Sequence, residues 1–355
     1  MTDRDLRGAE LARSFFSDVV EPLLGRALPG LEYAAARLGS GSDMLGLDDA
    51  MSRDHDWGCR LTLLVDDHSG DQVPRIRRLL NEELPERYQE FPVRFRVTWD
   101  ASLSHQVEVA TVAGFAASRL GVDPTGGMSV LDWLTVTGQG VLEVTAGPVF
   151  TDRTRTLAAV RRLLAWYPPD VERYLLAAGW QRLCQLMAMV GRTAESGDEL
   201  GSRLLSARLA GDLMWLAFAW SGRWAPYDKW RGTVFRSLPV AAGLGPLLED
   251  AAAAAGWRER ENALAAACEL LLDVQRERLQ PTPESAVIPF FDRPYRTVDE
   301  AVPRRLLAGV TDPEVARLPP MVGSIEQWVD CVDVLSSPGR RAALQSVYRA
   351  WADAG

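Results

Sequence analysis

The sequence predicts an α+β fold, with an α/β domain over residues 1–153 followed by an all-α helical domain over residues 154–355. In the first part, short segments typical of strands alternate with helical patterns, as in domains built on a sheet. After Thr154 the segments become long and repeat their apolar residues at the 3.6-residue period of helices. A chain of 355 residues is long enough to form two domains with separate cores.

The first domain is expected to contain two helices and four or five strands. The helical spacing of apolar residues places the helices at residues 4–26 and 71–88, the second with a break near Pro85. Strands are expected where apolar residues alternate or fill both faces, at residues 31–38, 59–67, 92–99 and 105–112. The segment CRLTLLVDD, 59–67, is apolar on both faces and should be central in the sheet. Residues 141–152 should form an edge strand or a helix end.

The second domain is expected to be a helical bundle. Long helical patterns cover residues 156–192, 198–224 and 244–279. A later helix over residues 324–335 opens with a capping box formed by Ser324 and Gln327. Residues 281–303 are rich in proline and are expected to form an extended connector.

The composition is that of an ordinary globular protein, with 47% apolar and 25% charged residues. A net charge of −9 argues against nucleic acid as a partner, although a single nucleotide is compatible with it. No apolar run reaches the ~18 residues of a membrane span, and the N-terminus lacks a secretory signal. The four cysteines form no CxxC pair, and three histidines are too few for most histidine-built zinc sites. A cytoplasmic protein is expected.

Two aspartates lie one residue apart, just before the strand expected at 59–67. In a strand, Asp54 and Asp56 would point to the same side and His55 to the opposite side, where a structural hydrogen bond is expected. Carboxylates ~6–7 Å apart repel each other, and a divalent cation would compensate. Hard oxygen ligands suit Mg²⁺, which binds through one or two carboxylates and substrate phosphates.

A small flexible loop precedes the aspartates. Its residues are Gly39, Ser40, Gly41 and Ser42. They offer closely spaced backbone N–H groups and two hydroxyls with little bulk, which can surround phosphate oxygens. A phosphate neutralised by a metal on one side and by amides on the other is an arrangement for phosphoryl transfer.

The combination of strand, Gly-Ser loop and Asp-x-Asp resembles the motif of the nucleotidyltransferase superfamily, which includes kanamycin nucleotidyltransferase and the polymerase-β-like enzymes. Eleven residues separate Ser42 from Asp54, and thirteen separate Ser40 from Asp54. The segments GSGSDMLGLDDAMSRDHDWGCRLTL, LLAAGWQRLCQ, GDELGSRLLSARLAGDLM and APYDKWRGTVFRSLP are also similar to an uncharacterised bacterial family of unknown function with a DHDW motif. The likeness covers nearly the whole chain.

This resemblance implies a nucleotidyltransferase-type mixed sheet with flanking helices, followed by a helical bundle. It implies a two-metal Mg²⁺ site at Asp54 and Asp56, with ATP or another nucleoside triphosphate as the donor. The nucleoside monophosphate would pass to a hydroxyl of a small molecule, and pyrophosphate would leave. The base, the acceptor and the oligomeric state are left open.

The resemblance also implies a third carboxylate on a neighbouring strand, as a metal ligand or general base. Glu108, between two valines in HQVEVATV, is the first candidate, since a charge amid apolar residues is costly unless paired. Asp100 and Glu143 are alternatives, and Glu108 could instead face solvent on an edge strand. Asp43 is expected to cap a helix that leaves the loop.

Lys229 is the only lysine among 39 basic residues and lies between Tyr227 and Trp230. Its ammonium could contact a triphosphate, or it could be an ordinary solvated lysine. Arg231 and Arg236 could take its place. A second functional class stays open: a nucleotide-binding regulator, or a protein- or RNA-directed transferase of the toxin–antitoxin kind.

Overall fold

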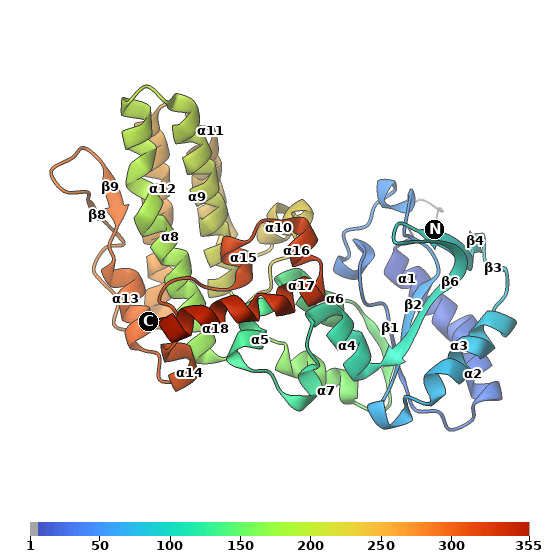
Figure 1. Ribbon diagram of the computed structural model, residues 1–355. Helices are drawn as coiled ribbons and strands as arrows, with labels where there is room; N and C mark the ends of the chain where they lie inside the picture. Colours follow the sequence, from blue (N-terminus) through green and yellow to red (C-terminus); the bar gives the residue numbers. More distant parts are fainter. Residues whose placement is uncertain (1–5, 355) are drawn as a thin grey trace. The chain divides into compact units, whose positions relative to one another are not determined.

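The computed structural model of the protein describes residues 6–354, and the chain packs as two compact units (Figure 1). The first unit comprises residues 6–128 and 140–165, and the second comprises residues 129–139 and 166–354. This division differs from the predicted boundary after residue 153. Helix α7 (Thr156–Leu163) belongs to the first unit, where Arg161 donates a hydrogen bond to the carbonyl oxygen of Gly147. Helix α5 (Val130–Thr135) packs against helices of the second unit.

The first unit is built on a five-stranded mixed sheet with the order β5–β6–β2–β1–β7. Its strands are β1 (Ala34–Ala36), β2 (Arg60–Val65), β5 (Arg94–Val97), β6 (Asp100–Thr111) and β7 (Val149–Asp152). Strands β2 and β6 are parallel, and the other pairs are antiparallel. Every residue of β2 is buried and β2 is the central strand, as its apolar pattern predicts. Residues 141–152 contain both predicted alternatives, the end of helix α6 (Gly138–Thr145) and the edge strand β7.

Helices cover one face of this sheet. They are α1 (Gly8–Phe15), the π-helical turn η1 (Phe16–Val20), α2 (Glu21–Ala27) and α3 (Gln72–Glu83). Their apolar residues form one core with Leu61 and Leu63 of β2 and Val107 and Val109 of β6. Because successive strand residues point to opposite faces, Arg60, Thr62 and Glu108 lie on the other face. Helix α4 (Val112–Leu120) contacts β2 and β6.

Short elements complete the first unit. They are the 3₁₀ turns η2 (Asp43–Leu45), η3 (Met51–Arg53), η4 (Asp67–Ser69) and η5 (Pro124–Gly126), and the two-stranded ribbon of β3 (Arg87–Tyr88) and β4 (Phe91–Pro92). Turns η2 and η3 lie in the segment between β1 and β2. This segment carries the predicted Gly-Ser loop and the two aspartates.

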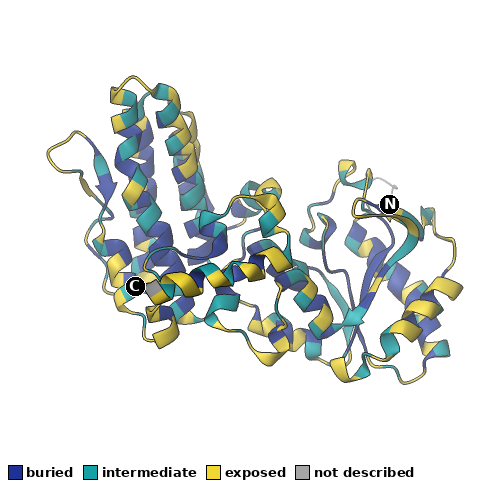
Figure 2. Cartoon of the chain, viewed as in Figure 1, coloured by how far each residue is buried: buried dark blue, intermediate teal, exposed yellow. Residues whose placement is uncertain are grey.

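The second unit is dominated by long helices, whose inner stripes are buried (Figure 2). These are α8 (Pro169–Glu195), α9 (Glu199–Trp220), α11 (Ala241–Ala253), α12 (Trp257–Arg278) and α13 (Ala301–Ala308). The unit is not all-α, because the proline-rich connector forms a hairpin of β8 (Val287–Pro289) and β9 (Arg296–Val298). Val287 and Ile288 pair with Val298 and Thr297, so β-branched residues favour strands on both sides of the turn.

The remaining helices are short: α10 (Asp228–Phe235), α14 (Pro313–Ala316), α15 (Ile325–Trp328), α16 (Val332–Leu335), α17 (Pro338–Ala343) and α18 (Gln345–Ala354). The capping box of Ser324 and Gln327 is present, but the helix predicted over residues 324–335 is divided into α15 and α16. Within residues 6–354, no helix has the length and apolar character needed to cross a membrane.

Candidate functional site

The Gly-Ser loop follows β1 and has a backbone that only glycine adopts readily. Gly39 has a φ of +85° and Gly41 a φ of +127°, both in the left-handed region. A side chain at Gly41 would also clash with the carboxylate of Asp43, and its Cβ would lie 2.6 Å from Nη2 of Arg37. Gly41 itself is exposed. Both glycines of the predicted motif are therefore required by the local structure.

A buried ion pair holds the loop from inside. Arg37 Nε and Nη2 each lie 2.7 Å from an oxygen of Asp43, and both side chains are almost fully buried. Nη2 of Arg37 also donates to the carbonyl oxygen of Ser40 at 2.7 Å. The expectation that Asp43 caps a helix is wrong, because its carboxylate binds Arg37 instead of a helix terminus. This bidentate geometry is the strong form of an arginine–carboxylate contact.

The backbone of the loop offers donors. Among residues 6–354, the N–H groups of Ser40, Gly41 and Ser42 have no protein acceptor. The N–H of Gly39 donates to the carbonyl oxygen of Glu143 at 2.8 Å. Consecutive N–H groups in a turn with left-handed residues form a concavity that binds anions. The loop is thus anchored at Gly39 and presents three donors next to it.

The Asp-His-Asp segment is not part of a strand, which corrects the expectation that Asp54 and Asp56 share a strand face. Strand β2 begins only at Arg60, and Gly58, with a φ of +146°, breaks the extended chain before it. Asp54 is exposed at the end of η3, and its Oδ1 lies 2.6 Å from Nδ1 of His55. His55 is exposed too, so it does not lie behind the sheet as predicted.

Asp56 is fixed by Thr98. Its carboxylate accepts a hydrogen bond from the backbone N–H of Thr98 at 2.6 Å and another from the Thr98 hydroxyl at 2.7 Å. The backbone of Asp56 is left-handed, with a φ of +55°. Asp56 therefore points toward the turn that joins β5 to β6, rather than beside Asp54.

Arg60, which the sequence analysis overlooked, joins the two loops. Its Nη1 donates to the carbonyl oxygen of Asp56 at 2.9 Å, and its Nη2 lies 3.3 Å from Oγ of Ser40. Burial lowers the pKa of Arg60 to about 9, with a further lowering from Arg37, while Asp43, Asp56 and Glu108 oppose the shift. At neutral pH Arg60 thus stays charged among three carboxylates. The sequence could have indicated Arg60, because it is a charged residue at the start of a strand that is otherwise mostly apolar and buried, and a buried charge needs partners.

Glu108 lies on the same face of the sheet, beside the Gly-Ser loop. It is in register with Thr62 of β2, and its side chain is 42% exposed. Arg119 of α4 binds it with Nη2 at 2.7 Å, and Nε of Arg119 lies 3.3 Å from Glu143. A Cβ built on Gly39 would lie 4.0 Å from Oε2 of Glu108. Glu108 faces solvent, yet its strand is interior and not an edge.

The two alternative acids are placed differently. Glu143 shares Arg119 with Glu108, so it is part of the same cluster. Asp100 begins β6 at the far end of the strand, where it accepts a hydrogen bond from the N–H of Ser102. That hydrogen bond lowers the pKa of the exposed Asp100. The structure therefore brings Glu108 and Glu143, but not Asp100, next to the Gly-Ser loop.

A divalent cation fits the donor chemistry of these residues, because carboxylate oxygens are the ligands that Mg²⁺ prefers. Asp54 presents an exposed carboxylate. In the arrangement shown, Asp56 uses both oxygens on Thr98, and Glu108 is paired with Arg119. Within residues 6–354, no three acidic, histidine or cysteine side chains are grouped as a metal site. To bind a metal at this site, Asp56 would have to give up its hydrogen bonds from Thr98 and contact the cation instead.

Lys229 lies in the second unit, on α10. It is exposed, and its Nζ lies 5.0 Å from the ring centre of Trp230. Such a contact is typical of a surface cation on an aromatic ring. Its role toward a triphosphate stays a prediction.

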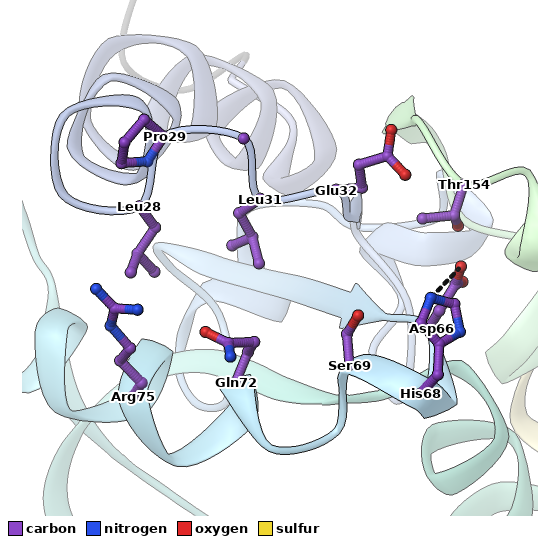
Figure 3. Close-up of a pocket in the computed structure, with 11 residues that line it drawn as sticks. Leu28, Pro29, Leu31, Glu32, Asp66, His68, Ser69, Gln72, Arg75 and Thr154 are labelled. Atoms are coloured by element: carbon purple, nitrogen blue, oxygen red, sulfur yellow. Dashed lines mark ion pairs between the residues drawn. The ribbon is translucent and has the colours of Figure 1, made fainter.

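A separate hollow of about 570 Å³ lies in the first unit (Figure 3). Its polar lining includes Asp66, His68 and Arg75, and Nε2 of His68 lies 4.0 Å from Oδ2 of Asp66. Asp66 directly follows β2, whereas the Gly-Ser loop lies near the beginning of β2. None of the residues predicted for the site lines this hollow.

The chain is similar to a family of unknown function and to a nucleotidyltransferase-like protein. A family model described as a domain of unknown function (DUF4037) matches residues 133–231. A nucleotidyltransferase-like protein from Exiguobacterium sibiricum is similar in structure, with 14% sequence identity over 78% of this chain and 83% of that chain. The TM-score is 0.32. No curated protein matches the sequence.

Proposed function

We propose that the protein is a Mg²⁺-dependent nucleotidyltransferase that moves a nucleoside monophosphate from a nucleoside triphosphate, in the first instance ATP, to a hydroxyl group of a small molecule. The observation that carries this proposal is the bridge made by Arg60. One guanidinium contacts both Ser40 of the Gly-Ser loop and Asp56 of the Asp-His-Asp segment. The loop whose N–H groups would bind phosphate and the segment that carries the two aspartates are thus linked by one side chain. They lie on the sheet face that also carries Glu108.

The free amides of Ser40, Gly41 and Ser42 would bind the β- and γ-phosphates. Their loop is rigid because Arg37 and Asp43 hold it from inside, so little ordering is needed when a ligand binds. Arg60 adds a positive charge behind the same loop. Donors fixed in advance stabilise the charge that develops on the leaving pyrophosphate.

In the reaction, the acceptor hydroxyl oxygen would form a bond to the α-phosphorus, and the bond from that phosphorus to the pyrophosphate oxygen would break. Glu108 is the group proposed to take the hydroxyl proton, because its carboxylate is exposed beside the loop. Arg119 and Glu143 position Glu108 through the ion pairs described above. Asp54 and Asp56 would hold the Mg²⁺, which would neutralise phosphate charge when bound.

The experiment uses the full chain and ATP labelled at the α-phosphate, with and without Mg²⁺. We expect ATP to raise the melting temperature only when Mg²⁺ is present, and labelled small hydroxylated acceptors to form with release of pyrophosphate. Asp54→Asn and Asp56→Asn should each lower the rate by at least 100-fold. Asp71→Asn, which alters an exposed carboxylate before α3, on the face of the sheet opposite Glu108, is the matched control and should keep the rate.

Unchanged transfer in Asp54→Asn and Asp56→Asn would disprove the proposal. Label found on a protein or RNA partner, with none on small acceptors, would overturn the acceptor class while keeping the reaction. The melting temperature of each variant without ligand shows whether it is folded.

A further inference from the structure

A second cavity, in the helical unit, is lined by three arginines. It has a volume of about 180 Å³ and lies among α8, α9, α10 and α15. Arg182, Arg208 and Arg231 come from three different helices. Asp212 and Glu326 are the acidic residues of its lining. Three guanidinium groups around one small cavity repel each other, so something must offset their charge.

The two acids in the cavity do not offset it fully. Asp212 accepts a hydrogen bond from Nε of Arg182 at 3.0 Å, so its negative charge is paired with one of the three arginines. Glu326 accepts the N–H of Gly138 at 3.0 Å, and burial raises its pKa to about 7. A carboxyl group with such a pKa is partly protonated at neutral pH, so it neutralises only part of one positive charge.

Two arginines of the cluster have side-chain donors without a protein acceptor among residues 6–354. Arg231 binds the exposed Asp228 through Nη2 at 2.7 Å, but its buried Nε has no hydrogen-bond partner among residues 6–354. Arg208 is exposed and, over the same described residues, makes no hydrogen bond or ion pair through its side chain. Buried donors are normally satisfied, and an unsatisfied one in a cavity indicates a ligand.

The cavity is built with room for that ligand. Gly179 lets α8 approach α9 closely, because a Cβ there would lie 2.6 Å from Cδ2 of Leu216. Gly211 lines the cavity, and a Cβ at that position would meet nothing within 4 Å. A volume of 180 Å³ corresponds to about six water molecules. Pockets for whole drug-sized ligands start near ~300 Å³, so the cavity suits a compact group.

We propose that this arginine cavity binds a phosphate monoester through its phosphoryl group, with Arg208 and Arg231 as the anion-binding residues. Guanidinium groups bind phosphate oxygens in pairs, and a doubly charged anion offsets more of the cluster than a carboxylate does. Asp212, whose buried Oδ2 has no hydrogen-bond partner within the described part of the chain, would accept a hydroxyl of the ester. The site is independent of the nucleotidyltransferase activity.

Calorimetric titration of the full chain tests this site, with no divalent cation present and with inorganic phosphate, glycerol 3-phosphate and acetate as probes. We expect glycerol 3-phosphate and phosphate to bind and acetate to bind at least tenfold more weakly. Arg208→Gln should weaken phosphate binding by about tenfold or more, since a charge-assisted hydrogen bond is lost. Gly211→Leu adds a bulky side chain at a position that lines the cavity, where a Cβ meets nothing within 4 Å, and should also weaken binding.

The controls separate an effect at the cavity from a general effect of lost charge or added side-chain volume. Arg223→Gln removes an exposed arginine of the same unit outside the cavity, and Gly25→Leu adds a side chain to another helix where a Cβ meets nothing. Both should bind phosphate like the unchanged protein. The proposal would be overturned if Arg208→Gln and Gly211→Leu bound phosphate as tightly as the unchanged protein does, or if the unchanged protein bound none. Either result leaves the ATP experiment untouched.

Discussion

The fully buried Arg37 of the first unit and the partly exposed Arg231 of the second unit show two uses of the same side chain. Arg37 gives its donors to Asp43, Leu38 and Ser40, all within its own loop. Arg231 keeps a buried Nε without an acceptor in the described part of the chain. Arg37, whose donors are satisfied, stabilises its own loop, whereas the buried Nε of Arg231 is the donor available to the ligand proposed above. Substitutions in the two places should therefore have different effects on stability and binding.

The largest effect is expected for Arg37→Ala. It leaves Asp43 buried without its partner, and breaking a buried pair in this way costs about 3–5 kcal/mol. Urea unfolding followed by circular dichroism measures the loss. Arg153→Ala is the control, because it breaks an exposed pair with Glu21 and should cost less than about 1 kcal/mol. Similar losses in the two variants would show that Arg37 is not a scaffold residue.

The second effect concerns Glu326 and depends on pH. Burial raises its pKa to about 7, so the folded protein holds the proton in a range where the unfolded chain releases it. Stability from this group is therefore lost as pH rises from about 4.5 to 7, by up to ~3 kcal/mol. Gly138, Arg231, Arg341 and Asp228 are the groups that act on it.

Glu326→Gln should remove this loss. Between pH 5 and pH 8, the free energy of unfolding should therefore fall less in the variant than in the unchanged protein. Urea unfolding at both pH values measures the change. Glu249→Gln, an exposed acid of the same unit, should keep the pH dependence of the unchanged protein. A steep loss that persists in Glu326→Gln would place the responsible group elsewhere.

The third effect, about 1–3 kcal/mol, is expected for Gly41→Ala, which strains a left-handed backbone. It also pushes a Cβ against Arg37 and Asp43. Gly46→Ala is the matched control, since Gly46 has a φ of +68° but a Cβ there meets nothing within 4 Å. It therefore carries the backbone strain alone and should cost less in thermal unfolding. Equal losses would mean that the contact with the ion pair adds nothing.

Much of the fold follows from local patterns. The apolar run at 59–67 predicts the central strand, and the long helical periods predict α8, α9 and α12, because burial repeats with the period of each element. The β8–β9 hairpin was missed, because three-residue strands among prolines give no measurable alternation. Residues 129–139 belong to the second unit and residues 156–163 to the first. This assignment depends on contacts between segments far apart in the sequence, which no local pattern encodes.

The site could be predicted only in part. Glu108 lies beside the Gly-Ser loop, because β1, which precedes the loop, and β6, which carries Glu108, both neighbour β2; a shared function of these residues stays a prediction. The orientation of Asp54 and Asp56 was wrong because it assumed that the strand extends through Gly58. The pairing of Arg37 with Asp43 and the contacts of Arg60 depend on how the chain returns on itself between β1 and β2.

The double contact of Arg60 makes the two loops one thermodynamic unit. If a phosphate binds at Ser40 and a cation at Asp56, as proposed above, both ligands would act on residues that contact the same guanidinium. By linkage, each ligand must then change the affinity for the other by the same factor. Cooperativity between nucleotide and metal would thus arise inside a single side chain.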